Sequence, residues 1–255
     1  MSTYGVWLSA AGMKINEHKQ SVLANNMANI NTVGFKHDLA VIRERRLESQ
    51  SSAGGFDAAH DVLDGLAGGV NVRPSHHNFG QGPIETTGRP MDVAIRGDGF
   101  FSVSDGSETR YTRNGAFTIN GAGELTLASG DGRWRVLDEN GLPIRLDPEG
   151  ERISVSASGT IRQGATELAT LGFHDTNDRG SLRKVGETLF EDQSGTMRPT
   201  RSEIAPESRE QSNFDVVGGL TSMIEITRAY ELNANLLRLQ DQALSEAVNT
   251  VGRLA

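Results

Sequence analysis

VVGGLTSMIEITRAYELNANLLRLQDQALSEAVNTV, residues 216–251, is the stretch of sequence that decides the fold. Alternate steps of four and three residues through it meet apolar or aromatic side chains at all but two positions. The positions are Val216, Leu220, Met223, Thr227, Tyr230, Ala234, Leu237, Asp241, Leu244, Val248 and Val251. An apolar repeat of about 3.5 residues predicts a helix that buries a seam against other helices, as in a coiled coil. At about 1.5 Å per residue the helix would be roughly 55 Å long, so it needs partners.

A second helix is predicted at the other end of the chain, over residues 1–33. Its apolar stripe is narrower and comprises Leu8, Ala11, Ile15 and Val22. The helix is expected to close in the run LANNMANINTVGF, residues 23–35, because asparagines compete for backbone hydrogen bonds and Gly34 is a natural stop. Lys36 to Leu47 is predicted to extend or restart a helix. The small, polar run from Glu48 to Asp61 is predicted to be a mobile loop or linker.

Between about Asn71 and Ser202 the apolar period changes to two, as in Val93 and Ile95. Five dipeptides that favour tight turns punctuate this region: Asp105-Gly106, Asn114-Gly115, Asn120-Gly121, Asp131-Gly132 and Asn140-Gly141. Asn-Gly and Asp-Gly supply the positive φ angles of hairpin turns. Regular turns between short alternating runs predict a module of antiparallel hairpins.

The predicted fold class is therefore α+β. Both ends carry apolar seams, so we expect them to pair into one discontinuous, coiled-coil-like domain into which an antiparallel all-β domain is inserted. The expected segments are the N-terminal helix (1–33), a connecting helix or loop segment (34–80), the β-rich domain (81–210) and the C-terminal helix (211–255).

Composition excludes several classes of protein. The 255 residues carry a net charge of -8, which argues against a nucleic-acid surface because phosphate binding needs a concentrated basic face. There is no cysteine, hence no disulfide or thiolate site. We expect no cleaved signal peptide, because charged residues interrupt the N-terminus early, and no membrane insertion, because no run approaches about 20 apolar residues. These rules alone would predict a soluble cytoplasmic protein.

Candidate catalytic and metal-binding motifs fail on inspection. Gly97-Asp98-Gly99 begins like a dinucleotide fingerprint, but Ser102 stands where the third glycine belongs. A calcium loop starting at Asp175 would have Arg179 and Gly186 at two ligand positions. No nucleophile-elbow or zinc-protease motif occurs. We therefore expect no catalytic residue, no metal, no cofactor and no enzymatic activity.

Several stretches resemble the flagellar rod and hook protein family of bacteria. They are LANNMANINTVGF after the first helix, RPMDVAIRGDGFFSV (residues 89–103), YTRNGAFTINGAGEL (111–125), QSNFDVV (211–217) and MIEITRAYELN (223–233). Their order and placement match as well, and the resemblance covers the chain outside residues 48–75. Phe214, where a valine is common, and Thr188, where an asparagine is common, depart from the family pattern.

The resemblance implies a structural subunit that assembles with itself and with other flagellar rod and hook proteins. In that family paired terminal helices form the inner core of a helical tube, with the β domain outside. Subunits pass uncleaved through the flagellar export apparatus to the periplasm-spanning rod of the basal body, which overrides the cytoplasmic expectation. A chain of this length with one β module resembles a rod protein, of the distal-rod type or its proximal-rod relative. A hook or hook-related subunit is the alternative within the family.

The residues expected at the assembly interface lie on both helices. On the first helix and the segment after it they are Ile15, Val22, Asn25, Asn26 and Asn29. On the last helix they are Leu220, Met223, Tyr230, Leu237 and Leu244. The polar breaks Thr227 and Asp241 are expected to set register between subunits. The alternative from another class is a closed coiled-coil oligomer that presents a β-rich binding module.

Overall fold

A computed structural model describes residues 4–44 and 70–251. The chain divides into two compact units. The helical unit holds the described parts of residues 1–27, 38–76 and 215–255, and the β unit holds residues 28–37 and 77–214. The predicted linker at 48–61 lies outside the described residues.

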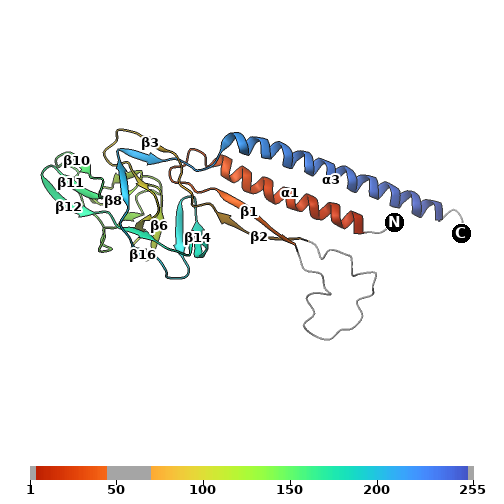
Figure 1. Cartoon of the computed structure of the whole chain (residues 1–255), viewed down its shortest axis with the longest axis horizontal. Helices are drawn as coiled ribbons and strands as arrows, with labels where there is room; N and C mark the ends of the chain where they lie inside the picture. The colour runs from red at the N-terminus through yellow and green to blue at the C-terminus, as the bar shows by residue number, and fades with distance from the viewer. Residues whose placement is uncertain (1–3, 45–69, 252–255) are drawn as a thin grey trace, which may run out of the picture. The chain divides into compact units, whose positions relative to one another are not determined.

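The helical unit contains α1 (Tyr4–Ala28) and α3 (Val216–Val251), which lie side by side (Figure 1). A Cβ atom added to Gly5 would come 2.9 Å from the side chain of Gln240, and one added to Gly12 would come 3.0 Å from that of Asn233. As the residue number rises along α1 it falls along α3, so the two helices are antiparallel. The predicted pairing of the terminal helices is confirmed.

Two strands, β1 (Asp38–Glu44) and β2 (Val70–His77), form a two-stranded sheet. The helix predicted from Lys36 to Leu47 is therefore wrong over residues 38–44. Val41 and Ile42 are β-branched and favour a strand, and so short an apolar run does not reveal its period. The first helix also ends earlier than predicted, at Ala28, and turns lead from there to Gly34.

The β unit is built from short strands joined mainly by turns. They are β3 (Ile84–Thr86), β4 (Val93–Arg96), β5 (Phe100–Ser104), β6 (Thr109–Thr112), β7 (Phe117–Ile119), β8 (Leu125–Leu127), β9 (Arg135–Val136), β10 (Ile153–Val155), β11 (Thr160–Gln163), β12 (Thr166–Thr170), β13 (Phe173–Asp175), β14 (Leu182–Val185), β15 (Leu189–Asp192), β16 (Arg198–Pro199), β17 (Glu203–Pro206) and β18 (Ser208–Glu210), with a 3-10 turn, η1 (Arg179–Ser181).

The largest sheet of this unit has the order β14-β15-β6-β5-β9-β8-β7, and β13 joins β5 and β16 beside that path. Smaller sheets pair β10, β11 and β12, β4 with β17, and β3 with β18. The paired strands of these sheets run antiparallel, as predicted. The last two sheets join strands from opposite ends of the unit, so its fold closes on itself.

Strand β5 lies between two apolar clusters. Phe101 packs in the main core with Phe117 and Phe173, at ring-centroid distances of 5.2 and 5.7 Å. Its neighbour Phe100 belongs to a second cluster with Phe190. Because successive side chains of a strand point to opposite faces, two adjacent phenylalanines bury both faces of β5.

Four of the five predicted turn dipeptides lie in turns between paired segments. At Asp131-Gly132 both residues have positive φ, 54° and 72°. Asn114-Gly115 is the exception, because β6 and β7 on either side of it do not pair with each other. A Cβ at Gly115 would lie 1.7 Å from the carbonyl oxygen of Val93, so this glycine allows a close backbone approach instead.

Candidate functional site

The face of α1 that packs on α3 is small and polar rather than apolar. Gly5 and Gly12 meet side chains of α3. Ser9, Asn16 and Leu23 are buried on the same side of α1, at steps of three, four or seven residues from these glycines and from one another. Of these residues only Leu23 is a large hydrophobe, so this face of α1 contributes little apolar surface to the helix pair.

The buried side of α3 coincides only in part with the predicted seam. Gly219 is buried, and Asn233 and Gln240 approach the glycines of α1. Leu220, one residue after Gly219, is 48% exposed. Tyr230 is also exposed, whereas the predicted positions Met223, Leu237 and Leu244 are half-buried.

The two polar breaks of the predicted seam are placed differently from each other. The hydroxyl of Thr227 donates to the carbonyl oxygen of Met223, 2.8 Å away in the same helix. Asp241 is exposed. Their expected role in register between subunits stays a prediction.

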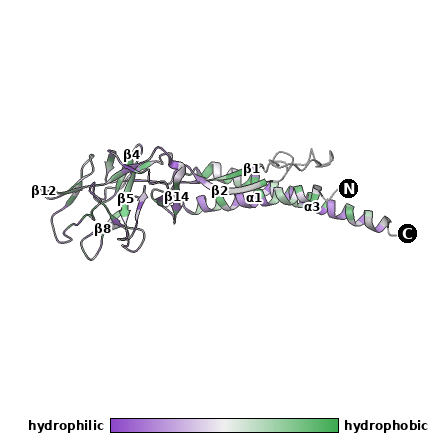
Figure 2. Ribbon diagram, turned by 90° about the horizontal axis from the view of Figure 1, so that it is seen from below, coloured by the Kyte–Doolittle hydropathy of each residue, from purple (hydrophilic) through white to green (hydrophobic). Residues whose placement is uncertain are grey.

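Large apolar side chains remain exposed along α3, and we call them the outer stripe. They are Val217, Leu220, Ile224, Leu232, Leu236 and Leu239. Steps of three and four residues separate them within each half of the helix, so each half presents one apolar patch. Figure 2 shows hydrophobic and hydrophilic positions interleaved along both helices. Exposed apolar surface of this extent marks an interaction site.

The residues predicted at the N-terminal contact fall in different environments. Ile15 lines a small groove with Trp7 and Val70, and Val22 is half-buried. Asn25 is exposed. Asn26 is buried, and its amide exchanges two 2.8 Å hydrogen bonds with the backbone N–H and carbonyl of Asp38, as a neighbouring strand would.

Asn29 lies in the turn after α1, where its side-chain oxygen accepts a hydrogen bond from the hydroxyl of Thr32 at 3.1 Å. Asn26 and Asn29 thus have structural roles within the chain. Whether any of the five N-terminal residues contacts a neighbouring subunit stays a prediction.

The β unit contains a buried ionic cluster, which we call the junction cluster: Lys36, Arg113 and Glu210. The side chains of Lys36 and Glu210 are completely buried, and Lys36 Nζ lies 2.6 Å from Glu210 Oε1. Arg113 Nη1 lies 3.3 Å from Glu210 Oε2, and the backbone N–H of Gly82 donates to Oε1 at 2.8 Å. The cluster joins the segment after α1 to the last strand before α3.

Further hydrogen bonds complete the junction cluster. Lys36 Nζ donates to the carbonyl oxygen of Gly80 at 2.7 Å, and Arg113 Nη2 donates to that of Gly97 at 2.8 Å. Burial lowers the pKa of Lys36 and that of Arg113, while Glu210 opposes both shifts. One carboxylate therefore holds two buried cations, and removing it would leave both charges uncompensated.

Gly34 allows the backbone to enter this region. It has a φ of 69°, and its N–H donates to the carbonyl oxygen of Glu210 at 2.7 Å. A Cβ here would lie 2.4 Å from the backbone of Arg113 and Asn114. The sequence marked Gly34 as a helix stop, but it serves a close approach six residues after the helix has ended.

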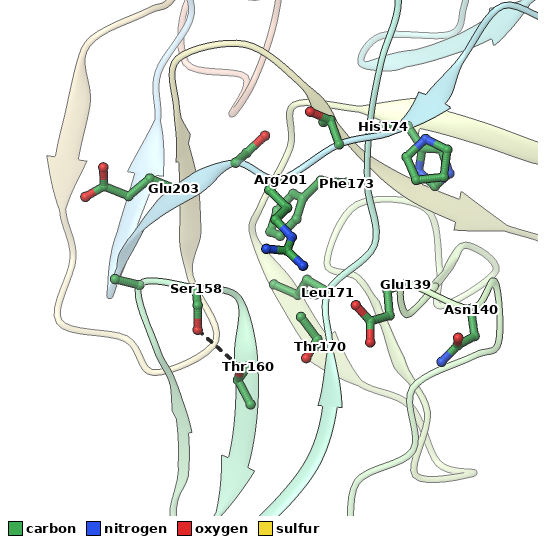
Figure 3. Close-up of a pocket in the computed structure, with 14 residues that line it drawn as sticks. Glu139, Asn140, Ser158, Thr160, Thr170, Leu171, Phe173, His174, Arg201 and Glu203 are labelled. Carbon is green, nitrogen blue, oxygen red and sulfur yellow. Dashed lines mark hydrogen bonds between the residues drawn. The ribbon is translucent and has the colours of Figure 1, made fainter.

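A cleft of about 1020 Å³ opens on the β unit, lined by residues such as Glu139, His174 and Arg201 (Figure 3). Glu203 lies on one side of the close-up and Glu139 on the other. The hydrogen bond drawn there joins two hydroxyls, Ser158 and Thr160, at 3.2 Å, and neither can act as a general base for the other. This arrangement does not resemble a catalytic site.

Sequence reasoning missed the polar packing face of α1 and the junction cluster. The signal for the first was Gly5 and Gly12, seven residues apart, with Ser9 and Asn16 at the same spacing. The junction cluster had no comparable signal, because Lys36 and Glu210 are 174 residues apart and either alone is typical of a solvated surface.

Within residues 4–44 and 70–251 no group of three or more His, Asp or Glu side chains could hold a metal ion. Over the same residues, neither helix has a stretch apolar enough to cross a membrane.

Comparison with known proteins gives one consistent result. Residues 9–36 match the family "Flagella basal body rod protein", residues 94–163 the family "Flagellar hook protein FlgE/F/G D1 domain", and residues 207–250 the family "Flagellar basal body rod FlgEFG protein C-terminal".

Relatives match over nearly their full length. The chain is 34% identical to the "Flagellar basal-body rod protein FlgF" of Caulobacter vibrioides over 236 residues, which cover 91% of both chains. It is 31% identical to the "Flagellar basal-body rod protein FlgG" of Bacillus subtilis over 262 residues, 94% of this chain and 96% of that one.

Proposed function

Because the chain belongs to the flagellar basal-body rod protein family, we propose that its subunits polymerise through their terminal helices into a tubular shaft that transmits torque from motor to hook. The family makes the chain a structural subunit of the rod, not an enzyme, and implies assembly with other rod and hook subunits. The polymerisation and the transmission of torque are our proposal.

The observation that carries the proposal is the outer stripe on α3. Burying one exposed leucine stabilises an assembly by about 1.5–3 kcal/mol, and the stripe offers several such side chains. Because the stripe is exposed while another face of α3 packs on α1, one subunit can use the two faces for different contacts. Contacts between different surfaces do not close into a dimer, so they suit an open helical assembly.

We also propose that the sequence-predicted interface residues of α3 divide between contacts with neighbouring subunits and the contact with α1. Leu220 and Tyr230 are exposed and available to a neighbouring subunit. Met223, Leu237 and Leu244 are half-buried, so we expect them to contribute mainly to the helix pair.

The test is Leu236→Asp, which places a charge in the outer stripe at a side chain that is 49% exposed. We expect the purified variant to fold as the parent does, and cells that carry it to lack rods and motility. Asn235→Asp is the matched control, because it adds the same charge at the neighbouring exposed position outside the stripe. Electron microscopy of basal bodies measures assembly. Rods at normal numbers in the Leu236→Asp strain would contradict the proposal.

Light scattering addresses the closed coiled-coil alternative. A closed oligomer has one fixed mass at all concentrations, whereas we expect the purified rod subunit to stay monomeric until nucleated and then to grow. A single stable oligomer that does not grow would favour the alternative.

We further propose that the subunit reaches the rod through the flagellar export apparatus without cleavage. The support is membership of the family. The subunit should stay inside cells whose export apparatus is inactive, and its intact mass in purified rods should equal that of the full chain. A shorter mass would contradict uncleaved export.

A further inference from the structure

The chain passes between its two units next to residues 27, 37, 76 and 214. On the β-unit side, three residues beside these passages are joined by hydrogen bonds: His37, Asn78 and Asn213. The backbone N–H of Asn78 donates to the carbonyl oxygen of His37 at 2.9 Å. The side chain of Asn213 contacts both of the other segments.

Asn213 uses the full hydrogen-bonding capacity of its amide group. Its Nδ2 donates to the carbonyl oxygens of Asn78 and Gly80, at 2.8 and 2.9 Å. Its Oδ1 lies 2.9 Å from the backbone N of His37 and 2.9 Å from the ring Nδ1 of the same residue. An amide has two donor hydrogens and two acceptor lone pairs, and all four are matched here.

This pattern sets the orientation of both side chains. Because Oδ1 can only accept, the Nδ1 atom of His37 must carry a proton and donate it. Nδ2 must face the two carbonyl oxygens, since Oδ1 in that place would repel them. Aspartate would keep the acceptors and lose both donors, and alanine would lose all four bonds.

We propose that Asn213 is a non-covalent cross-link of the rod subunit: its amide holds the segments at His37, Asn78 and Asn213 together as one rigid group where the chain leaves the β unit for the helical unit. Three of the four passages then move together, so a load on the helices reaches the β unit through a bundle of segments and not through separate flexible chains. This role rests on the proposed shaft function.

The junction cluster does not supply the same connection. It holds the segment at Lys36 and the strand at Glu210 to the body of the β unit, and it acts through buried charge. Asn213 acts after Glu210, within the last residues before α3, and joins neighbouring passages to one another. Loss of the Asn213 cross-link is therefore expected to loosen the passages while the β unit remains folded.

The experiment is residue-resolved hydrogen exchange of the purified full-length chain. In Asn213→Ala we expect the amides of His37 and Asn78 to exchange about tenfold faster or more, while that of Gly34, which is bonded to Glu210, stays protected. Asn120→Ala is the matched control, because Asn120 accepts bonds from Ala122 and Glu124 in a turn of the same unit. Unchanged exchange at His37 and Asn78 would overturn the inference, and so would faster exchange throughout the β unit.

Asn213→Asp separates the two halves of the contact. It keeps the acceptor for the His37 amide and loses the donors to Asn78 and Gly80. We expect the His37 amide to stay slower than in Asn213→Ala, and the amide of Gly80, which donates to the side chain of Asn78, to exchange faster than in the parent. Equal exchange rates in the two variants at both amides would contradict a cross-link whose donors and acceptor hold different segments.

In cells, Asn213→Ala should leave rods present in normal numbers and reduce swimming speed. The reduction relative to the parent should be largest under high viscous load. Absence of rods would overturn the inference, because Asn213 would then be needed for assembly. Failure of the shaft proposal itself shows elsewhere, as normal assembly in the Leu236→Asp strain.

Discussion

The β unit and the helical unit bury their apolar side chains to different degrees. In the β unit a continuous core surrounds β5, with Phe101 and Leu127 almost fully buried. Among the described residues of the helical unit, Leu23 is the one large hydrophobe that is buried. Meanwhile α3 leaves Leu232 65% exposed. The β unit resembles a finished domain, whereas the helical unit resembles one half of an interface.

The difference follows from the two ways in which the segments obtain stability. Antiparallel strands of the β unit bond to one another and enclose their own core, so they need no second copy. A helix in water is held chiefly by the packing of its apolar face, and α1 offers α3 a face of glycine, serine and asparagine. The small face allows close approach, and it leaves large apolar side chains of α3 exposed. Under the proposed function, the β unit supplies stability and the helical unit supplies the contacts for assembly.

The largest expected effect is a loss of stability in the β unit when its buried carboxylate is removed. Glu210→Ala leaves the buried cations of Lys36 and Arg113 without their carboxylate, and we expect it to lower the free energy of unfolding by about 3–5 kcal/mol. Urea denaturation of the full-length chain measures the loss. Lys36→Met should cost less, because Arg113 still faces the carboxylate.

Glu203→Ala is the control for that loss. Its ion pair with Arg96 spans 3.8 Å with both side chains more than half exposed, so its removal should cost less than about 1 kcal/mol. If Glu210→Ala cost no more than Glu203→Ala, the junction cluster would not stabilise the unit.

A smaller effect is expected in the helical unit, at the contact between α1 and α3. Gly12→Leu would force a side chain against Asn233, whose amide lies about 3 Å from the place of a Cβ atom. Overpacking of this kind costs roughly 1–3 kcal/mol. We expect α1 and α3 to lose protection from hydrogen exchange while the β unit keeps its own.

Ala24→Leu places the same leucine side chain at an exposed position of α1 and should leave the exchange of both helices unchanged. Similar losses in the two variants would mean that the close glycine contact is not what holds the helices together. Loss of protection in the β unit of Gly12→Leu would erase the contrast between the units.

The sequence predicted the features that depend on local patterns. The seven-residue repeat predicted α3, and Asp131-Gly132 predicted a turn with two positive φ angles, because each signal lies within a few neighbouring residues. The family followed from motifs such as LANNMANINTVGF. A strand at Asp38–Glu44 escaped because its partner β2 is distant in sequence.

The predicted seam of α3 coincides only in part with the face that packs on α1, for a physical reason. An apolar repeat indicates that a helix will be buried, but it does not say against which partner. The pattern of leucines combines the seam with the outer stripe, and glycines and asparagines form much of the contact with α1. Contacts set by tertiary structure, such as those of Glu210 and Asn213, leave no periodic trace.

The smallest effect is expected from pH, and it concerns the β unit alone. His174 lies beside Tyr111 with its Nδ1 buried and without a hydrogen-bond partner, and burial lowers the pKa of its imidazole below the usual value of 6.5. The unfolded chain therefore takes up a proton at a higher pH than the folded chain, so stability declines as the pH falls from about 6.5 towards the lower pKa of the folded state. The carboxyl pKa values of Asp98 and Glu191 are lowered by hydrogen bonds from Arg179 and Arg183, and their contribution is lost only at more acidic pH.

In His174→Gln we expect the decline in stability between pH 7 and 5 to become shallower, as measured by urea midpoints across that range. The other histidines are present in parent and variant alike, so the difference between the two curves isolates His174. Parallel curves would show that its protonation does not limit the stability of the β unit, and a steeper curve in the variant would reverse the sign of the argument.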